Sequence, residues 1–178
     1  ITTGEGGVAT TNSKKINDYL KSFRNHGIIR DKNRMEVKSQ GPWYFEQKYL
    51  GLNYRMTDIQ AALGISQLKR LDMIVKKRNA IAKNYNRKLS SLPIKMVSIQ
   101  DENISSFHLY PIMIKNGKKN KKHLKIFNYL KKKGINVGLH YIPIYKHPYF
   151  KRFKFKSISY PNTQEYYSSA MSLPIFFE

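Results

Sequence analysis

The stretch GLNYRMTDIQAALGISQLKR, residues 51–70, decides how we expect the chain to fold. Thr57 followed three residues later by Gln60 is a capping box, in which the hydroxyl and the amide satisfy free N–H groups at the start of a helix. An aspartate in the first turn and two basic residues in the last turn have the signs that the helix dipole favours. The pattern therefore predicts a helix that begins just after Thr57.

We expect this helix to have one apolar face. Its members are Met56, Ile59, Ala62, Leu63 and Leu68, with Ala61 and Gly64 small enough for close packing. Just before the helix lie Asn53 and Arg55, an amide and a guanidinium beside free backbone donors, which is a good place to hold a phosphate. On spacing alone, an ordinary capped helix with a polar lead-in is the more common explanation, and these residues leave both interpretations open.

The first part of the chain carries a turn, a short strand, a helix and a long loop. A glycine-rich turn at residues 4–7 precedes a predicted buried strand at residues 8–11. Ser13 is placed to cap a helix that runs through about Phe23, and Gly27 after it is the natural residue for a left-handed C-cap. The polar stretch 31–47 reads as a long loop.

The second part predicts alternating helices and strands. A helix at residues 72–92 is followed by a strand at 107–114, a basic helix at 118–133 and a returning strand at 135–139. This β-α-β pattern is followed by a last short helix at 164–171. We place a domain boundary near Asp72, with residues 1–72 in one domain and 73–178 in another.

Composition excludes several classes of function. The net charge of +22 would favour nucleic acid, but the basic residues are spread along the chain, and we expect none to be bound. Cysteine is absent and the five histidines have no paired helical spacing, so no metal site is predicted. No apolar run is long enough to span a bilayer, and we expect no membrane contact.

Four segments together resemble one protein family. They are ITTGEGGVATTN at the start, GLNYRMTDIQAALG in the signature stretch, SSFHLYPI and VGLHYIPIYKHPYF. In this order they resemble the DegT-like sugar aminotransferases, which are fold-type I enzymes that use pyridoxal 5'-phosphate (PLP). The resemblance implies an α/β fold, with residues 1–72 ending the large PLP-binding domain and 73–178 forming a truncated small domain.

The resemblance also implies that the catalytic lysine lies outside this chain. In the family, the lysine that carries PLP stands two positions ahead of the residue matching Ile1. We therefore expect a C-terminal fragment of a longer protein, cut at both ends and inactive alone. Thr2 and Thr3 follow the lysine position and are candidates for orienting that lysine, although buried strand threonines explain them equally well.

The resemblance assigns binding roles to five residues. The residue matching Asn53 is offered to the PLP phosphate of the neighbouring subunit, which implies a homodimer with shared active sites. Arg55 lies beside it and is a candidate for the cofactor or substrate phosphate. His140, Tyr141 and Tyr145 resemble the segment that lines the nucleotide-sugar site, where basic and aromatic side chains suit an anionic sugar substrate.

We therefore expect part of a cytoplasmic PLP-dependent aminotransferase. It would move an amino group from glutamate to a nucleotide-linked 4-keto-6-deoxy sugar, UDP-linked, for a surface glycan or flagellin sugar of the pseudaminic acid type. One alternative is a non-catalytic basic binding protein, such as the product of a split or degenerate gene. Another is a PLP sugar dehydratase of the same family, in which histidine replaces the lysine.

Overall fold

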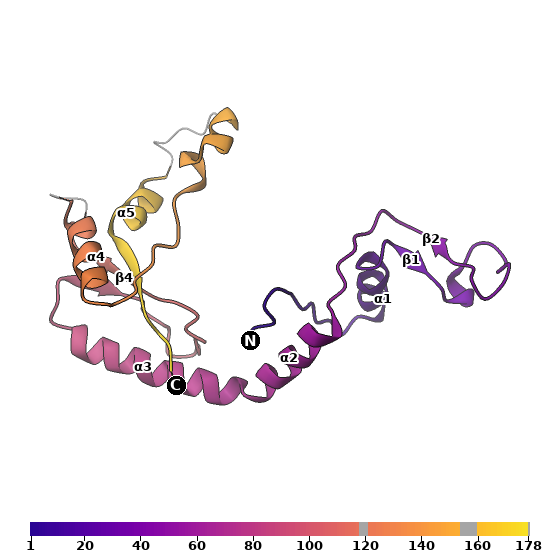
Figure 1. Cartoon of the computed structure of the whole chain (residues 1–178), viewed down its shortest axis with the longest axis horizontal. Coiled ribbons are helices and arrows are strands. Elements are labelled where there is room, and N and C mark those ends of the chain that lie inside the picture. Colours follow the sequence, from indigo (N-terminus) through magenta and orange to yellow (C-terminus); the bar gives the residue numbers. More distant parts are fainter. Residues whose placement is uncertain (118–120, 154–159, 178) are drawn as a thin grey trace. The chain divides into compact units, whose positions relative to one another are not determined.

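The computed structural model describes residues 1–117, 121–153 and 160–177 and divides into two compact units (Figure 1). The units are Ile1–Leu71 and Asp72–Glu178. That the first belongs to a large PLP-binding domain and the second to a small domain stays a prediction.

The first unit contains two helices and one pair of short strands. In chain order its elements are α1 (Lys14–Phe23), β1 (Ile28–Ile29), the 3₁₀ turn η1 (Lys32–Arg34), β2 (Glu46–Gln47) and α2 (Asp58–Lys69). β1 and β2 pair in antiparallel register, so the predicted long loop is closed at its base by a small ladder.

Both ends of α1 form as predicted. The Ser13 hydroxyl accepts a hydrogen bond from the Ile16 N–H, which satisfies one of the free donors of the first turn. After the helix, Gly27 has a φ of +69°. A Cβ added there would lie 2.0 Å from the carbonyl oxygen of Tyr49, so this position requires glycine for both conformation and space.

A carboxylate organises the loop between the two short strands. The Glu46 side chain accepts hydrogen bonds from the backbone N–H groups of Glu36 at 2.9 Å and Val37 at 2.7 Å. The Lys48 ammonium lies 2.7 Å from the same carboxylate. The hydrogen bond from Lys48, followed by those from the two N–H groups, lowers the pKa of Glu46 to about 2.

The predicted strand at residues 8–11 is wrong. These residues have no regular secondary structure and are exposed, and Val8 has 83% of its surface accessible. A strand needs a neighbour to take up its backbone hydrogen bonds, and no strand in the described part of the chain pairs with this segment.

The capping box of α2 is confirmed, but its single buried face is not. The Thr57 hydroxyl accepts from the Gln60 N–H, and the Gln60 side chain accepts from the Thr57 N–H. None of the residues in α2 is buried, and Ile59 and Ile65 expose 83% and 60% of their surface. The apolar side chains lie on more than one side of the helix, so the sequence does not define one inward face.

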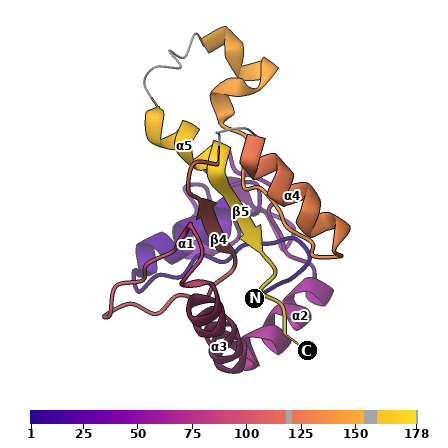
Figure 2. The same ribbon diagram turned by 90° about the vertical axis from the view of Figure 1, so that its left-hand side faces the viewer.

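The second unit is a three-stranded sheet with helices packed on it (Figures 1 and 2). In chain order its elements are α3 (Leu71–Leu89), β3 (Ile94–Met96), β4 (Tyr110–Ile114), α4 (Lys122–Lys132), the 3₁₀ segments η3 (Ile144–Lys146) and η4 (Pro148–Phe153), α5 (Pro161–Ser169) and β5 (Ala170–Leu173). The sheet order is β3-β4-β5, and both pairs are antiparallel.

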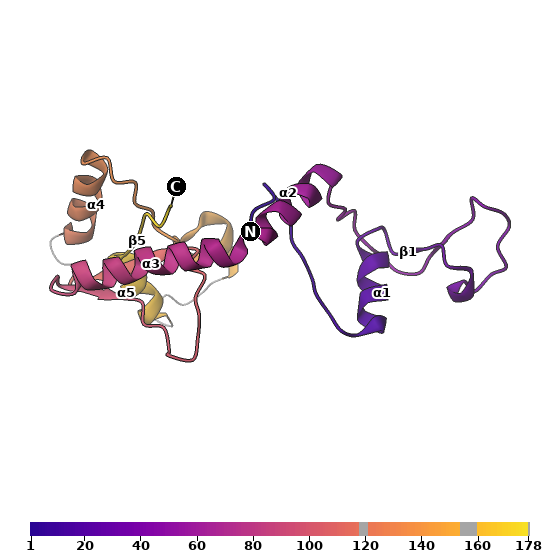
Figure 3. The same cartoon turned by 90° about the horizontal axis from the view of Figure 1, so that it is seen from below.

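The core lies on one face of this sheet. Along β4 the side chains of Tyr110, Ile112 and Ile114 are buried, while the two between them are only half-buried. This alternation is that of a strand with one core face. Ala82 from the long helix α3 and Phe127 from α4 pack with them, so both helices cover the same face (Figures 2 and 3).

Several predicted boundaries in the second unit differ from the structure. The helix predicted at 72–92 ends at Leu89, and the strand predicted at 107–114 begins at Tyr110. The basic helix predicted at 118–133 begins at Lys122, and residues 118–120 of that prediction lie outside the described part. Each difference is confined to the ends of an element, where sequence signals are weakest.

Two predictions after α4 need correction. The strand predicted at 135–139 is reduced to one antiparallel bridge between Gly138 and Ser172. The helix predicted at 164–171 ends at Ser169. Met171 instead lies in β5, the strand that pairs with β4 and contains Ser172 of that bridge. Residues 170–173 lack β-branched side chains and do not read as a strand; pairing with β4 decides their conformation.

Candidate functional site

The segment that precedes α2 is held by the end of α1. The Leu52 N–H donates to the Phe23 carbonyl at 2.8 Å, and the Tyr54 N–H donates to the Arg24 carbonyl at 2.9 Å. Between them, Asn53 forms an antiparallel bridge with Asn25. These backbone bonds fix the chain just before α2 and leave the Asn53 side chain exposed at the surface.

Asn53 and Arg55 form one polar pair at this place. The Arg55 Nε donates to the Asn53 Oδ1 at 2.8 Å. Because the amide oxygen is already used, the Asn53 Nδ2 and the two terminal nitrogens of Arg55 are the donors that can turn to a ligand. Planar guanidinium and amide donors beside a helix N-terminus are a donor set suited to a phosphate group.

The N-terminal turn is attached to the start of α2 (Figure 3). The Gln60 Nε2 donates to the Glu5 carbonyl at 3.0 Å, across 55 positions of sequence. The predicted roles of Thr2 and Thr3 stay open, since both hydroxyls bond within the turn, Thr2 accepting from the Gly4 N–H and Thr3 donating to the Glu5 carbonyl. The long-range bond of Gln60 has no sequence signal, because the capping box alone explains that residue.

The second group of predicted site residues begins at His140. The His140 Nδ1 lies 3.0 Å from the hydroxyl of Ser172, which is buried in β5. Its ring meets the Tyr141 ring edge to face, with 4.7 Å between centroids. Tyr141 itself is 75% exposed, so its hydroxyl and ring face are accessible.

Tyr145 is turned toward α5. Its hydroxyl is bonded to the side-chain amide of Gln164, and its ring stacks on Tyr160 with centroids 5.3 Å apart. Pro143, which lies between Tyr141 and Tyr145 in the sequence, is buried. Tyr145 therefore anchors the segment to α5, while Tyr141 remains the exposed member.

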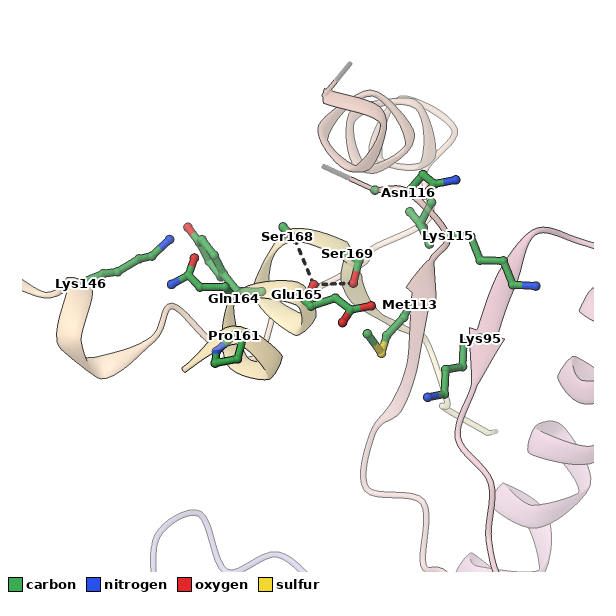
Figure 4. Close-up of a pocket in the computed structure, with 13 residues that line it drawn as sticks. Lys95, Met113, Lys115, Asn116, Lys146, Pro161, Gln164, Glu165, Ser168 and Ser169 are labelled. Carbon is green, nitrogen blue, oxygen red and sulfur yellow. Dashed lines mark hydrogen bonds between the residues drawn. The ribbon is translucent and has the colours of Figure 1, made fainter. Parts of the chain in front are cut away.

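A groove of about 640 Å³ lies next to this segment (Figure 4). Its lining residues are Lys95, Met113, Ile114, Lys115, Asn116, Gly117, Lys146, Pro161, Gln164, Glu165, Tyr167, Ser168 and Ser169. The Lys146 ammonium lies 4.3 Å from the centre of the Tyr167 ring, a cation–π contact. Sequence reading missed the groove because its lining comes from segments far apart in the chain.

The predicted cofactor residues, Asn53 and Arg55, belong to the first unit, and His140, Tyr141 and Tyr145 belong to the second. The structure brings Arg55 to Asn53 and His140 to Tyr141. Tyr145 instead contacts Gln164 and Tyr160. Over residues 1–117, 121–153 and 160–177, no group of three or more His, Asp or Glu side chains is placed to hold a metal ion. Within the same ranges, no helix is both long and apolar enough to cross a membrane.

Comparison with known proteins shows which family and which relatives the chain resembles. The model of the DegT/DnrJ/EryC1/StrS aminotransferase family matches residues 1–178. An uncharacterized protein, MJ1066, of Methanocaldococcus jannaschii is 38% identical over 99% of this chain and 46% of its own length. The UDP-4-amino-4,6-dideoxy-N-acetyl-beta-L-altrosamine transaminase of Campylobacter jejuni is 35% identical over 98% of this chain and 44% of its own.

A solved structure gives the same result. PseC of Helicobacter pylori, described as an aminotransferase involved in the biosynthesis of pseudoaminic acid, matches with a TM-score of 0.76 and 30% identity. The match covers 92% of this chain and 42% of that one. The chain thus spans less than half the length of these relatives. The predicted fold class, an α/β part of a fold-type I PLP-dependent transferase, is confirmed, and the chain belongs to the DegT/DnrJ/EryC1/StrS aminotransferase family.

Proposed function

We propose that the chain is part of a PLP-dependent aminotransferase that moves an amino group from glutamate to a nucleotide-linked 4-keto-6-deoxy sugar. The observation that carries the proposal is the hydrogen-bonded Asn53–Arg55 pair just before α2, whose free donors suit a phosphate, in a chain matched over its whole length by an aminotransferase family. In this proposal residues 1–72 belong to the large domain and residues 73–178 to the small domain.

The cofactor contact is made through phosphate. The Asn53 Nδ2 and the terminal nitrogens of Arg55 donate hydrogen bonds to phosphate oxygens of PLP. When bound, PLP supplies the electron sink on which amino-group transfer depends. We propose that this phosphate belongs to the neighbouring subunit of a homodimer, so that each subunit completes the other's site.

The substrate contact is made by the segment after α4. A nucleotide sugar carries its charge at the diphosphate, far from the carbon that reacts. The diphosphate therefore anchors the substrate, and contacts with the sugar ring determine which sugar is accepted. Lys146 and the imidazole of His140 are suited to the diphosphate. Tyr141, exposed beside His140, offers a hydroxyl and a flat face to the sugar or base. Tyr145 holds the segment against α5 and acts on the substrate through that placement.

The sugar we propose is a UDP-linked 4-keto-6-deoxy-N-acetylhexosamine. The support is the Campylobacter jejuni relative, whose name specifies an N-acetyl-altrosamine with a 4-amino group and deoxy positions at carbons 4 and 6. Nucleotide sugars and glutamate are both metabolites of the cytoplasm, where we place the reaction. The product would serve a surface-glycan or flagellin sugar of the pseudaminic acid type.

The test compares sugars in the whole enzyme, purified as a PLP-loaded dimer with the portion that its relatives have and this chain does not span. UDP-linked 4-keto-6-deoxy-N-acetylhexosamine and dTDP-4-keto-6-deoxyglucose are each supplied with glutamate, and products are identified by mass. We expect an amino sugar from the UDP substrate at a much higher rate. Preference for the dTDP sugar would contradict the substrate, and a product that has lost a hydroxyl group instead would indicate a dehydratase.

A further inference from the structure

Gln60 makes two different hydrogen bonds with the two ends of one amide. Its Oε1 accepts from the Thr57 N–H at 3.1 Å, which completes the capping box. Its Nε2 donates to the Glu5 carbonyl at 3.0 Å. The first bond serves the helix alone, whereas the second joins α2 to a turn at the other end of the first unit.

The turn that Gln60 holds is packed closely against the start and middle of α2. At Gly6, whose φ is +154°, an added Cβ would lie 2.7 Å from the Met56 Cε. At Gly64, an added Cβ would lie 3.2 Å from the Thr3 Cγ2. The two glycines therefore allow the N-terminal segment to lie against α2, and Met56 directly follows Arg55 in the chain.

We propose that Gln60 is a positioning residue for the cofactor site. It holds the N-terminal turn against α2 and Met56, the residue that follows Arg55 in the chain, so that the turn and the Asn53–Arg55 pair keep one arrangement around the phosphate. The inference rests on the proposed function, in which that pair binds PLP. A glutamine that only caps the helix needs only its Oε1. The bond from Nε2 to the Glu5 carbonyl therefore distinguishes the positioning role from the capping role.

One substitution separates the roles. Gln60→Glu keeps an oxygen that accepts from the Thr57 N–H, and its negative charge in the first turn is favoured by the helix dipole. It has no N–H to donate to the Glu5 carbonyl, and its carboxylate repels that oxygen. Thr57→Ala is the reverse control, because it removes the capping hydroxyl and leaves the Gln60 amide free to hold the turn.

The first measurement is made on the 178-residue chain by NMR. In the unaltered chain we expect nuclear Overhauser effects between the Met56 methyl and Gly6, and between the Thr3 methyl and Gly64. Gln60→Glu is expected to lose both while retaining the amide–amide contacts within α2. Thr57→Ala is expected to keep both. Retention of both contacts in Gln60→Glu would overturn the proposal.

The second measurement is the dissociation constant of PLP in the whole dimeric enzyme. Loss of one neutral hydrogen bond is expected to raise it about two- to tenfold in Gln60→Glu, and by less than about twofold in Thr57→Ala. If the unaltered enzyme binds PLP and Gln60→Glu binds it equally well, this inference is overturned and the proposed function stands. If the unaltered enzyme binds no PLP, both fail.

Discussion

The Nε of Arg55 donates a hydrogen bond to the side-chain oxygen of Asn53 at 2.8 Å, between two residues that are both exposed. This bond sets which way the amide faces, because the oxygen that points to Arg55 leaves the Nδ2 pointing away from it. Two side chains that are two positions apart thereby present their remaining donors as one unit.

Asn53→Ala is expected to weaken PLP binding in the whole enzyme without unfolding it. A hydrogen bond to a charged phosphate contributes about 1.5–3 kcal/mol, so the dissociation constant should rise roughly ten- to a hundredfold. Asn103→Ala, at an exposed asparagine of the second unit, is the matched control and should leave the constant unchanged. An unchanged dissociation constant of PLP in Asn53→Ala would show that Asn53 has only a structural role.

Covalent attachment of PLP is expected to be absent from the 178-residue chain alone. The family resemblance puts the reactive lysine ahead of the residue matching Ile1, and the lysines of α3 and α4 are exposed or only half-buried. The chain is mixed with PLP, reduced with borohydride and digested, and the labelled peptides are identified by mass. Stoichiometric labelling of a single lysine within residues 1–178 would contradict the prediction.

The loop closed by β1 and β2 is expected to be stable until low pH. The pKa of Glu46 is lowered to about 2 from an ordinary value of 4.5, so its ionised form stabilises the fold above pH 4.5. That contribution is lost as the pH falls from 4.5 through 2. A carboxyl-carbon NMR titration of Glu46 checks it.

Removing Lys48 provides the control for this titration. The hydrogen bond from Lys48 is the main cause of the lowered pKa, so Lys48→Met should move the Glu46 titration toward higher pH. The two backbone N–H donors remain in that variant and should keep part of the effect. An ordinary carboxyl titration in the unaltered chain would mean that the loop is not organised by Glu46.

Tyr110→Phe is expected to destabilise the second unit. The side chain is fully buried, and its hydroxyl donates to the Asn86 side-chain oxygen. Burial also raises the pKa of Tyr110, so the neutral hydroxyl is the form present at neutral pH. Losing this donor breaks the hydrogen bond, but Asn86 is exposed and its oxygen can bond to water instead, so the free energy of unfolding should fall by about 0.5–1.5 kcal/mol.

The comparison is with Tyr129→Phe on α4, where the side chain is 60% exposed and the ring contact with Lys133 is preserved. That substitution should change the free energy of unfolding by less than about 0.5 kcal/mol. Denaturant unfolding of both variants gives the two values. Equal values for the two tyrosines would show that the buried hydroxyl contributes nothing.

The starts of α1 and α2 were predictable because short local capping patterns decide them, whereas the predicted ends of α3 and α5 were misplaced. Ser13 and Thr57 cap α1 and α2 as expected, and Gly27 has the positive φ expected after a helix. Strands were less predictable, because pairing partners decide them. Residues 8–11 find no partner in the described part of the chain, whereas β5 is formed by residues without strand preference because β4 lies beside it.

In the candidate site, contacts between residues close in sequence were predictable, and contacts between distant residues were not. Asn53 and Arg55 are close in sequence, and their pairing follows from a local chain segment. The bond from Gln60 to Glu5 and the contact of His140 with Ser172 join residues 55 and 32 positions apart, and nothing in the local pattern indicates them. The family resemblance suggested roles for Asn53, Arg55 and His140, which stay predictions, and the structure gives their neighbours.

The most direct test of the central claim follows the amino group itself. The PLP-loaded whole enzyme is given glutamate labelled with ¹⁵N and the UDP-linked 4-keto-6-deoxy-N-acetylhexosamine, and the sugar product is examined by NMR. We predict ¹⁵N bonded to carbon 4 of the sugar, and little label in the product of Asn53→Ala at limiting PLP. A PLP-loaded dimer that transfers no ¹⁵N to the sugar would contradict the account.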